Sequence, residues 1–135
     1  TLDALELSDE NLETARQAWT AGGVLDRIKV RIGPAMQTLT SMLDEPLAGT
    51  YDFMYIDADK VNNKGYYELG LQLVRSGGII AIDNMFYSGM VADPSCNDES
   101  TIAIRELAAL MLTDNRIDYS LVPIGDGLAI ARIRD

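Results

Sequence analysis

The chain has 135 residues, 47% of them hydrophobic and 24% charged, which is the composition of one globular domain with its own core. The net charge of −10 argues against nucleic acid as a partner, because nucleic-acid binding needs a basic face, and leaves no basic patch for anionic lipid. No apolar run approaches the roughly 20 residues of a membrane span, and no signal peptide opens the chain. We therefore expect a cytoplasmic protein that binds no membrane.

Histidine is absent and there is a single cysteine, Cys96. A disulfide within the chain, a cysteine-based zinc site and a nucleophile paired with histidine are therefore excluded. A general base must come from Asp, Glu, Lys, Tyr or Cys. A metal ion must be held by oxygen atoms, which favours magnesium, manganese or calcium.

The hydrophobic pattern predicts strands that alternate with helices. Ser8 is the expected cap of the first helix, and Gly22-Gly23 and Gly77-Gly78 are expected to end the first and third helices. The expected strands are 2–7, 28–32 (at a sheet edge), 53–56 (covered on both faces), 79–82, 117–122 and 128–133, and the expected helices are 12–21, 36–43, 66–74 and 102–111.

This alternation predicts an α/β fold, a parallel sheet with helices on both faces. The Gly125-Asp126-Gly127 turn predicts a final hairpin that adds an antiparallel edge strand. The long stretch from Asn84 to Glu99 has little periodicity, and loops of this length are usually functional or mobile. We expect one domain over residues 1–135.

Polar or turn residues follow four of the predicted strands. In open parallel sheets, ligands bind beyond the carboxyl ends of the strands, so these residues are the candidate site. The residues are Glu6, Gly33-Pro34, Asp57 to Lys60, and Asp83-Asn84. Asp57, Asp83 and Asn84 would supply oxygens from two neighbouring strand ends, which suits a cation such as magnesium.

Each of these residues also has a structural interpretation. Glu6 is either an exposed acid or a ligand for ribose hydroxyls, and Gly33-Pro34 is either a turn alone or part of a site. Asp57 and Asp59 could cap the next helix, and Lys60 could be a surface lysine. Phe86 and Tyr87 are either ordinary packing residues or the wall of a pocket for a flat substrate.

Taken together, these motifs resemble the cation-dependent O-methyltransferases, the group that contains the catechol and caffeoyl-coenzyme A O-methyltransferases. The combination of DADK, GG…DN and GDG in this order is specific. The matching pieces are ALELS (4–8), AGGVLDRIKVRIGPA (21–35), YDFMYIDADK (51–60), LVRSGGIIAIDNMFYSGMVADP (73–94) and PIGDGLAIARI (123–133).

The resemblance implies a Rossmann-like sheet and S-adenosylmethionine-dependent methyl transfer to a small phenolic substrate with neighbouring hydroxyls. It implies these roles: Asp57, Asp83 and Asn84 as ligands of a divalent cation (Mg, or Mn or Ca), Lys60 as base with Asp57 in the catalytic set, Glu6, Gly33, Ala35, Asp57 and Asp59 at the cofactor, and Tyr87 and Ser88 at the substrate. Relatives are often homodimers, and a homodimer is a further expectation.

The family's first strand, its glycine-rich turn and its N-terminal helices have no counterpart in the sequence, so we expect residues 1–135 to correspond to the C-terminal portion of a single methyltransferase domain. In the family fold the first strand lies beside the strand that ends at Asp57. We expect the chain to close this gap, to pair with another chain, or to be part of a longer protein.

Two other functions stay open. The first is a binding or interaction module that keeps the sheet but lacks catalysis. The second is a phosphate-transfer receiver domain, which also gathers acids around magnesium at strand ends, but which would carry its lysine on a later strand than Lys60.

Overall fold

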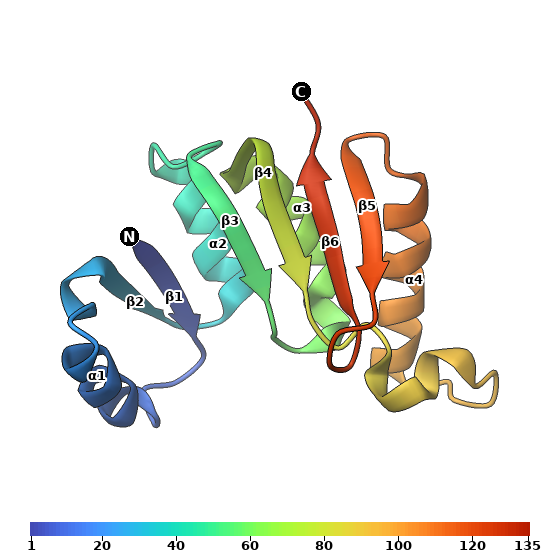
Figure 1. Cartoon of the computed structure of the whole chain (residues 1–135), viewed down its shortest axis with the longest axis horizontal. Coiled ribbons are helices and arrows are strands. Elements are labelled where there is room, and N and C mark those ends of the chain that lie inside the picture. Colours follow the sequence, from blue (N-terminus) through green and yellow to red (C-terminus); the bar gives the residue numbers. More distant parts are fainter. The chain divides into compact units, whose positions relative to one another are not determined.

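The computed structural model describes residues 1–135 (Figure 1). The chain forms two compact units, Thr1–Ser41 and Met42–Asp135. The strands form two sheets, a parallel pair β1-β2 and a four-stranded sheet of order β3-β4-β6-β5. None of the helices has the length and apolar character that crossing a membrane requires.

The first unit is built on a parallel strand pair. Its elements are β1 (Leu2–Glu6), α1 (Leu12–Ala21), the short helix η1 (Leu25–Arg27), β2 (Ile28–Ile32) and the start of α2 (Ala35–Asp44). β2 pairs along one side with β1, as expected of an edge strand. Ser8 does not cap α1, because the helix begins at Leu12, where the hydrophobic spacing predicts it, and Asn11 precedes its first residue.

The second unit contains the four-stranded sheet. Its elements are β3 (Tyr51–Ile56), η2 (Lys60–Asn62), α3 (Asn63–Leu73), β4 (Val74–Ile82), η3 (Tyr87–Ala92), α4 (Glu99–Thr113), β5 (Ile117–Val122) and β6 (Leu128–Ile133). β3 and β4 are parallel, and β6 is antiparallel to both β4 and β5. The antiparallel strand of the hairpin therefore lies inside the sheet, and not at its edge as predicted.

The boundary between α3 and β4 also differs from the prediction. We expected Gly77-Gly78 to end the helix, but α3 ends at Leu73 and both glycines lie within β4. Pairing of Val74 with Tyr51 starts the strand earlier. Gly78 must be a glycine here, because a Cβ atom at this position would lie 2.9 Å from the main-chain oxygen of Asp52.

One face of the four-stranded sheet is covered by α3 and α4, which pack against each other on the same side (Figure 1). Ile80 and Ile82 of β4 are fully buried on this face. On the opposite face Phe53 is 54% exposed and Tyr55 51% exposed. The expectation that β3 is covered on both faces is therefore wrong, and within this unit α3 and α4 share one side of the sheet.

The strands on either side of the expected gap, β1 and β3, do not pair with each other. β1 has β2 as its strand neighbour, and β3 has β4. Direct closure of the gap by strand pairing, the first of the three expected outcomes, is therefore not seen.

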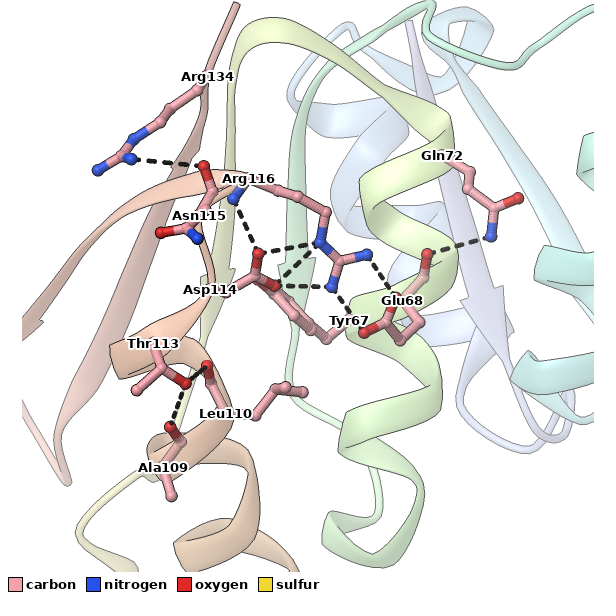
Figure 2. A network of polar contacts seen from close by, with 10 residues as sticks. All are labelled: Tyr67, Glu68, Gln72, Ala109, Leu110, Thr113, Asp114, Asn115, Arg116 and Arg134. Carbon is pink, nitrogen blue, oxygen red and sulfur yellow. Dashed lines mark hydrogen bonds and ion pairs between the residues drawn. The ribbon is translucent and has the colours of Figure 1, made fainter.

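A network of charged side chains ties α3 to the loop between α4 and β5 (Figure 2). Arg116 donates to both carboxylate oxygens of Glu68 at 2.8 Å and to Asp114 at 2.7 Å. The hydroxyl of buried Tyr67 donates to Asp114 at 2.8 Å. We call Tyr67, Glu68, Asp114 and Arg116 the arginine network; it lies at the end of the sheet where β5 begins.

Candidate functional site

The parallel pairing of β3 with β4 places the predicted metal ligands at one end of the sheet. Tyr55 is paired with Ala81 and Ile56 with Ile82, so Asp57 and Asp83 follow these strands at the same level. The main-chain N–H of Asp83 donates to the carbonyl of Ile56 at 3.0 Å, which extends the ladder by one step. The two acids are therefore held close by the backbone itself.

Lys60 brings the oxygens of both strand ends together. Its Nζ lies 2.8 Å from Oδ1 of Asn84, 3.5 Å from Oδ1 of Asp57 and 3.5 Å from the main-chain oxygen of Asp83. The Lys60 side chain is 11% exposed, whereas that of Asp57 is 56% exposed. We call Asp57, Lys60, Asp83 and Asn84 the oxygen cluster; it presents oxygens from two strands around one positive charge.

Asp83 is held by partners on both carboxylate oxygens. Tyr55 donates its hydroxyl to Oδ2, and the main-chain N–H of Asn84 donates to Oδ1 at 2.6 Å. The hydrogen bond from Tyr55, followed by that from Asn84, lowers the pKa of Asp83. The same contact with Asp83 raises the pKa of Tyr55 to about 12. Asp83 therefore stays a carboxylate at neutral pH.

Asp59 lies beside the cluster but bonds to its own helix. Its carboxylate accepts hydrogen bonds from the hydroxyl of Tyr66 at 2.5 Å and from the side chain and main chain of Asn62. Partial burial raises the pKa of Asp59, but the hydrogen bonds from Tyr66 and Asn62 outweigh burial and lower it. The capping role that the sequence left open is therefore present, and a role at the cofactor stays a prediction.

Tyr87 and Ser88, the predicted substrate residues, lie in a strained turn. Both have positive φ angles, 46° and 53°, in the left-handed region that side chains other than glycine seldom adopt. The main-chain N–H of Ser88 donates to Oδ1 of Asp126 at 2.8 Å and to Oδ2 at 3.1 Å. Sequence reasoning missed Asp126, because a Gly-Asp-Gly motif indicates only a tight turn.

Arg105 on α4 holds the next part of the same loop. Its guanidinium donates to main-chain oxygens only, at 2.5 to 3.0 Å; the acceptors are Met90, Val91, Asp93 and Cys96. No sequence pattern indicated this role, because a lone arginine on an amphipathic helix is ordinarily a solvated side chain. The loop that we predicted to be functional or mobile is therefore fixed at four main-chain positions.

The residues predicted for the cofactor in the first unit are close to one another. Glu6 is the exposed last residue of β1, and its carbonyl accepts a hydrogen bond from the main-chain N–H of Gly33 at 2.9 Å. Gly33 has a φ of 140°, which only glycine adopts readily, and Ala35 is the first residue of α2. These residues thus form one edge at the carboxyl ends of β1 and β2.

The predicted metal ligands are two carboxylates and one amide. The structure contains no group of three or more His, Cys, Asp or Glu side chains that could hold a metal ion. The oxygen cluster contributes two carboxylates, and its third side-chain oxygen is the amide oxygen of Asn84. The assignment of Asp57, Asp83 and Asn84 as metal ligands stays a prediction.

Comparisons with known proteins identify the family. A family model described as O-methyltransferase matches residues 1–134. The chain is 45% identical over 128 residues to "Probable caffeoyl-CoA O-methyltransferase 2" of Dictyostelium discoideum, which covers 94% of the chain and 55% of that protein. The chain belongs to the O-methyltransferase family.

Solved structures agree with this assignment. The structure of an O-methyltransferase from Bacillus cereus in complex with SAH is 31% identical, with a TM-score of 0.87; the match covers 98% of the present chain and 62% of the Bacillus cereus chain. An SAH-bound methyltransferase from Podospora anserina matches 98% of the chain and 60% of its own, with 34% identity and a TM-score of 0.82. The chain thus spans between 55% and 62% of the length of these relatives.

Proposed function

We propose that the protein transfers a methyl group from S-adenosylmethionine to one hydroxyl of a catechol-like substrate, with the help of a divalent cation. Membership in the O-methyltransferase family supports the reaction class. The SAH-bound state of two related structures supports the cofactor. The caffeoyl-CoA name of a relative and the oxygen cluster support a phenolic substrate and a cation.

The observation that carries the proposal is the convergence of oxygens on Lys60. Three residues from two strand ends place an oxygen within 3.5 Å of one ammonium nitrogen. A positive charge is therefore already accommodated at this point by one carboxylate, one amide oxygen and one main-chain oxygen. The side chains of the same three residues offer two carboxylates and an amide oxygen, a donor set that suits magnesium or manganese. Asp57, Asp83 and Asn84 would hold the cation, whose charge favours ionisation and orientation of the two hydroxyls.

Lys60 is placed to receive the proton from the hydroxyl that is methylated. Its Nζ lies among the same oxygens and is largely shielded from solvent, at 11% side-chain exposure. To act as base, Lys60 must first give up a proton to solvent; its neutral amine then takes the hydroxyl proton and returns to the ammonium form, while the phenolate oxygen would form a bond to the methyl carbon of S-adenosylmethionine. The bond from that carbon to sulfur breaks, and S-adenosylhomocysteine leaves with the electron pair.

The remaining assignments concern the cofactor. In our proposal Glu6 binds the ribose hydroxyls, and Gly33 and Ala35 lie against the adenine. Asp57 and Asp59 face the amino-acid portion, and the hydrogen bonds from Asn62 and Tyr66 fix the orientation of the Asp59 carboxylate in advance.

Metal binding tests the cluster without any need for turnover. Titration with Mn²⁺, followed by its paramagnetic signal, should show a site in the unmodified chain, and Asp83→Ala should weaken it about 10- to 100-fold. Asp52→Ala is the matched control, because Asp52 is 80% exposed and pairs with Arg75. Equal affinities of Asp83→Ala and the unmodified chain would refute the proposed ligand set.

Turnover tests the base. With catechol and S-adenosylmethionine as substrates, Lys60→Met should lower kcat about 100-fold and change the affinity for S-adenosylhomocysteine, measured by calorimetry, less than twofold. Equal losses of turnover and cofactor affinity would show that Lys60 supports binding and is not the base. Binding of the cofactor without methyl transfer by the unmodified protein would instead favour the non-catalytic binding module.

A further inference from the structure

The backbone between β4 and η3 is strained at three residues that are not glycine. Asn84, Tyr87 and Ser88 have φ angles of 60°, 46° and 53°. Asparagine tolerates the left-handed region, but tyrosine and serine adopt it only at an energetic cost. Two such residues in succession keep this conformation only where neighbouring groups hold it.

The neighbouring groups belong to the turn of the β5-β6 hairpin. The main-chain N–H of Met85 donates to the carbonyl of Gly127 at 2.9 Å, and that of Phe86 donates to the carbonyl of Asp126 at 2.8 Å. The carboxylate of Asp126 then accepts from the N–H of Ser88 with both oxygens. A hydrogen bond to an ionised group is roughly twice as strong as one between neutral groups, so this contact is suited to hold the strained end.

The close approach of the hairpin depends on Gly127. This residue is buried, and its φ is 85°. A Cβ atom at this position would lie 2.7 to 2.9 Å from three carbons of the Phe86 ring. The hairpin backbone therefore lies directly against Phe86, which brings the Asp126 carboxylate to the next turn of the chain.

The strained turn is also connected to the oxygen cluster. The main-chain N–H of Tyr87 donates to the carbonyl of Asn84 at 3.1 Å, and Oδ1 of Asn84 accepts from Lys60. A shift of the Tyr87–Ser88 turn would therefore change the position of the predicted substrate residues relative to the cluster. Asp126 itself forms no hydrogen bond or ion pair with the oxygen cluster.

We propose that Asp126 is a positioning residue for the substrate: its carboxylate, through the N–H of Ser88, holds Tyr87 and Ser88 in the left-handed conformation that places them beside the reacting hydroxyl. This inference rests on the proposed function, in which Tyr87 and Ser88 contact the phenol. In this proposal the Gly-Asp-Gly turn positions the substrate-contacting residues in addition to joining two strands.

The first test needs no turnover. Hydrogen exchange of the Ser88 amide, followed by NMR, should become about tenfold faster in Asp126→Ala than in the unmodified protein, because the amide loses its acceptor. Asp126→Asn keeps one side-chain oxygen as acceptor and should stay within about threefold. Asp118→Ala is the matched control, since Asp118 is an exposed acid of the same hairpin that bonds to Arg132 and Arg134. An unchanged Ser88 exchange rate in Asp126→Ala would overturn the inference.

The second test compares steady-state constants for catechol and S-adenosylmethionine. Asp126→Ala should lower kcat/KM for catechol about tenfold or more, because small displacements of positioning groups are costly. Its KM for S-adenosylmethionine and its Mn²⁺ affinity should change less than twofold, and Asp126→Asn should recover most of the loss. A catechol kcat/KM within twofold of the unmodified protein, or an equal loss of Mn²⁺ affinity, would overturn the positioning role.

The two tests separate this inference from the proposed function. If the unmodified protein methylates no phenol, the proposed function fails, and with it the role of Asp126 in substrate placement. The Ser88 exchange rate in that case still decides whether Asp126 holds the turn. If the unmodified protein is active and Asp126→Ala behaves like Asp118→Ala in both tests, the proposed function stands and the positioning role fails.

Discussion

The second unit contains two contacts of the same chemical type at opposite ends of its sheet. At the end where β3 and β4 finish, the hydroxyl of Tyr55 donates to Asp83. At the end where β5 begins, the hydroxyl of Tyr67 donates to Asp114 (Figure 2). Tyr55 is 51% exposed and Tyr67 is fully buried. The two pairs therefore contain the same chemical groups but differ in the burial of the tyrosine.

The surroundings decide what each pair does. Asp114 belongs to the arginine network, in which one guanidinium donates hydrogen bonds to two carboxylates, and such hydrogen-bonded networks fix one packed arrangement. Asp83 lies beside Lys60 and Asn84. Asn84 has a left-handed backbone, and Asp57, the other acid of the oxygen cluster, is more than half exposed. We interpret the first pair as a stabilising contact and the second as part of a binding site.

The largest expected effect is the loss of stability on removal of Arg116. Arg116→Ala leaves Glu68 and the nearly buried Asp114 without their cation, which should lower the free energy of unfolding by roughly 2–3 kcal/mol. Arg75→Ala is the matched control, because Arg75 pairs with exposed Asp52 and should cost roughly 0.5 kcal/mol or less. Urea denaturation measures both. Equal losses would remove the distinction between the two ends of the sheet.

The same network should make stability depend on pH. Hydrogen bonds from Arg116 hold the pKa of Asp114 well below its usual range and also lower that of Glu68. A lowered pKa in the folded state means that the unfolded chain binds more protons, so this stability is present above a pH of about 4 and is lost as the pH falls. The difference in unfolding free energy between the unmodified protein and Arg116→Ala should therefore shrink by roughly half or more between pH 7 and pH 2.5, in urea titrations at each pH.

The smallest expected effect compares the two tyrosines directly. Tyr67→Phe should lower the free energy of unfolding by roughly 1–2 kcal/mol, because buried Asp114 loses a donor. Tyr55→Phe should cost roughly 0.5 kcal/mol or less, since solvent can replace the hydroxyl at a half-exposed position. Thermal unfolding followed by circular dichroism ranks the two variants. A reversed ranking would contradict the roles that we assign to the two pairs.

The elements of the fold were largely predictable, because hydrophobic periodicity and glycine positions are local signals. Strands β5 and β6 and the turn between them lie where their alternating pattern placed them. The position of β6 inside the sheet was not predictable, because the pattern of a hairpin does not say which of its strands pairs with β4. The early start of β4 was missed because its pairing with Tyr51 is a long-range contact.

The candidate site was predictable where residues follow strands and unpredictable where contacts come from elsewhere. Asp57 and Asp83 were placed together by the rule that parallel strands end at the same edge. Tyr55, Asp126 and Arg105 were not recognised, because their roles depend on distant partners in the sequence. No local pattern distinguishes an arginine that bonds a loop from one that faces solvent.

The way in which Arg105 holds the loop has an evolutionary consequence. All four of its acceptors are main-chain carbonyls, which every amino acid supplies. The side chains of residues 90–96 can therefore be exchanged without removing these hydrogen bonds. The backbone course of this segment therefore depends on Arg105 and not on the segment's own side chains, so substitutions here change the surface of the loop while its path is kept.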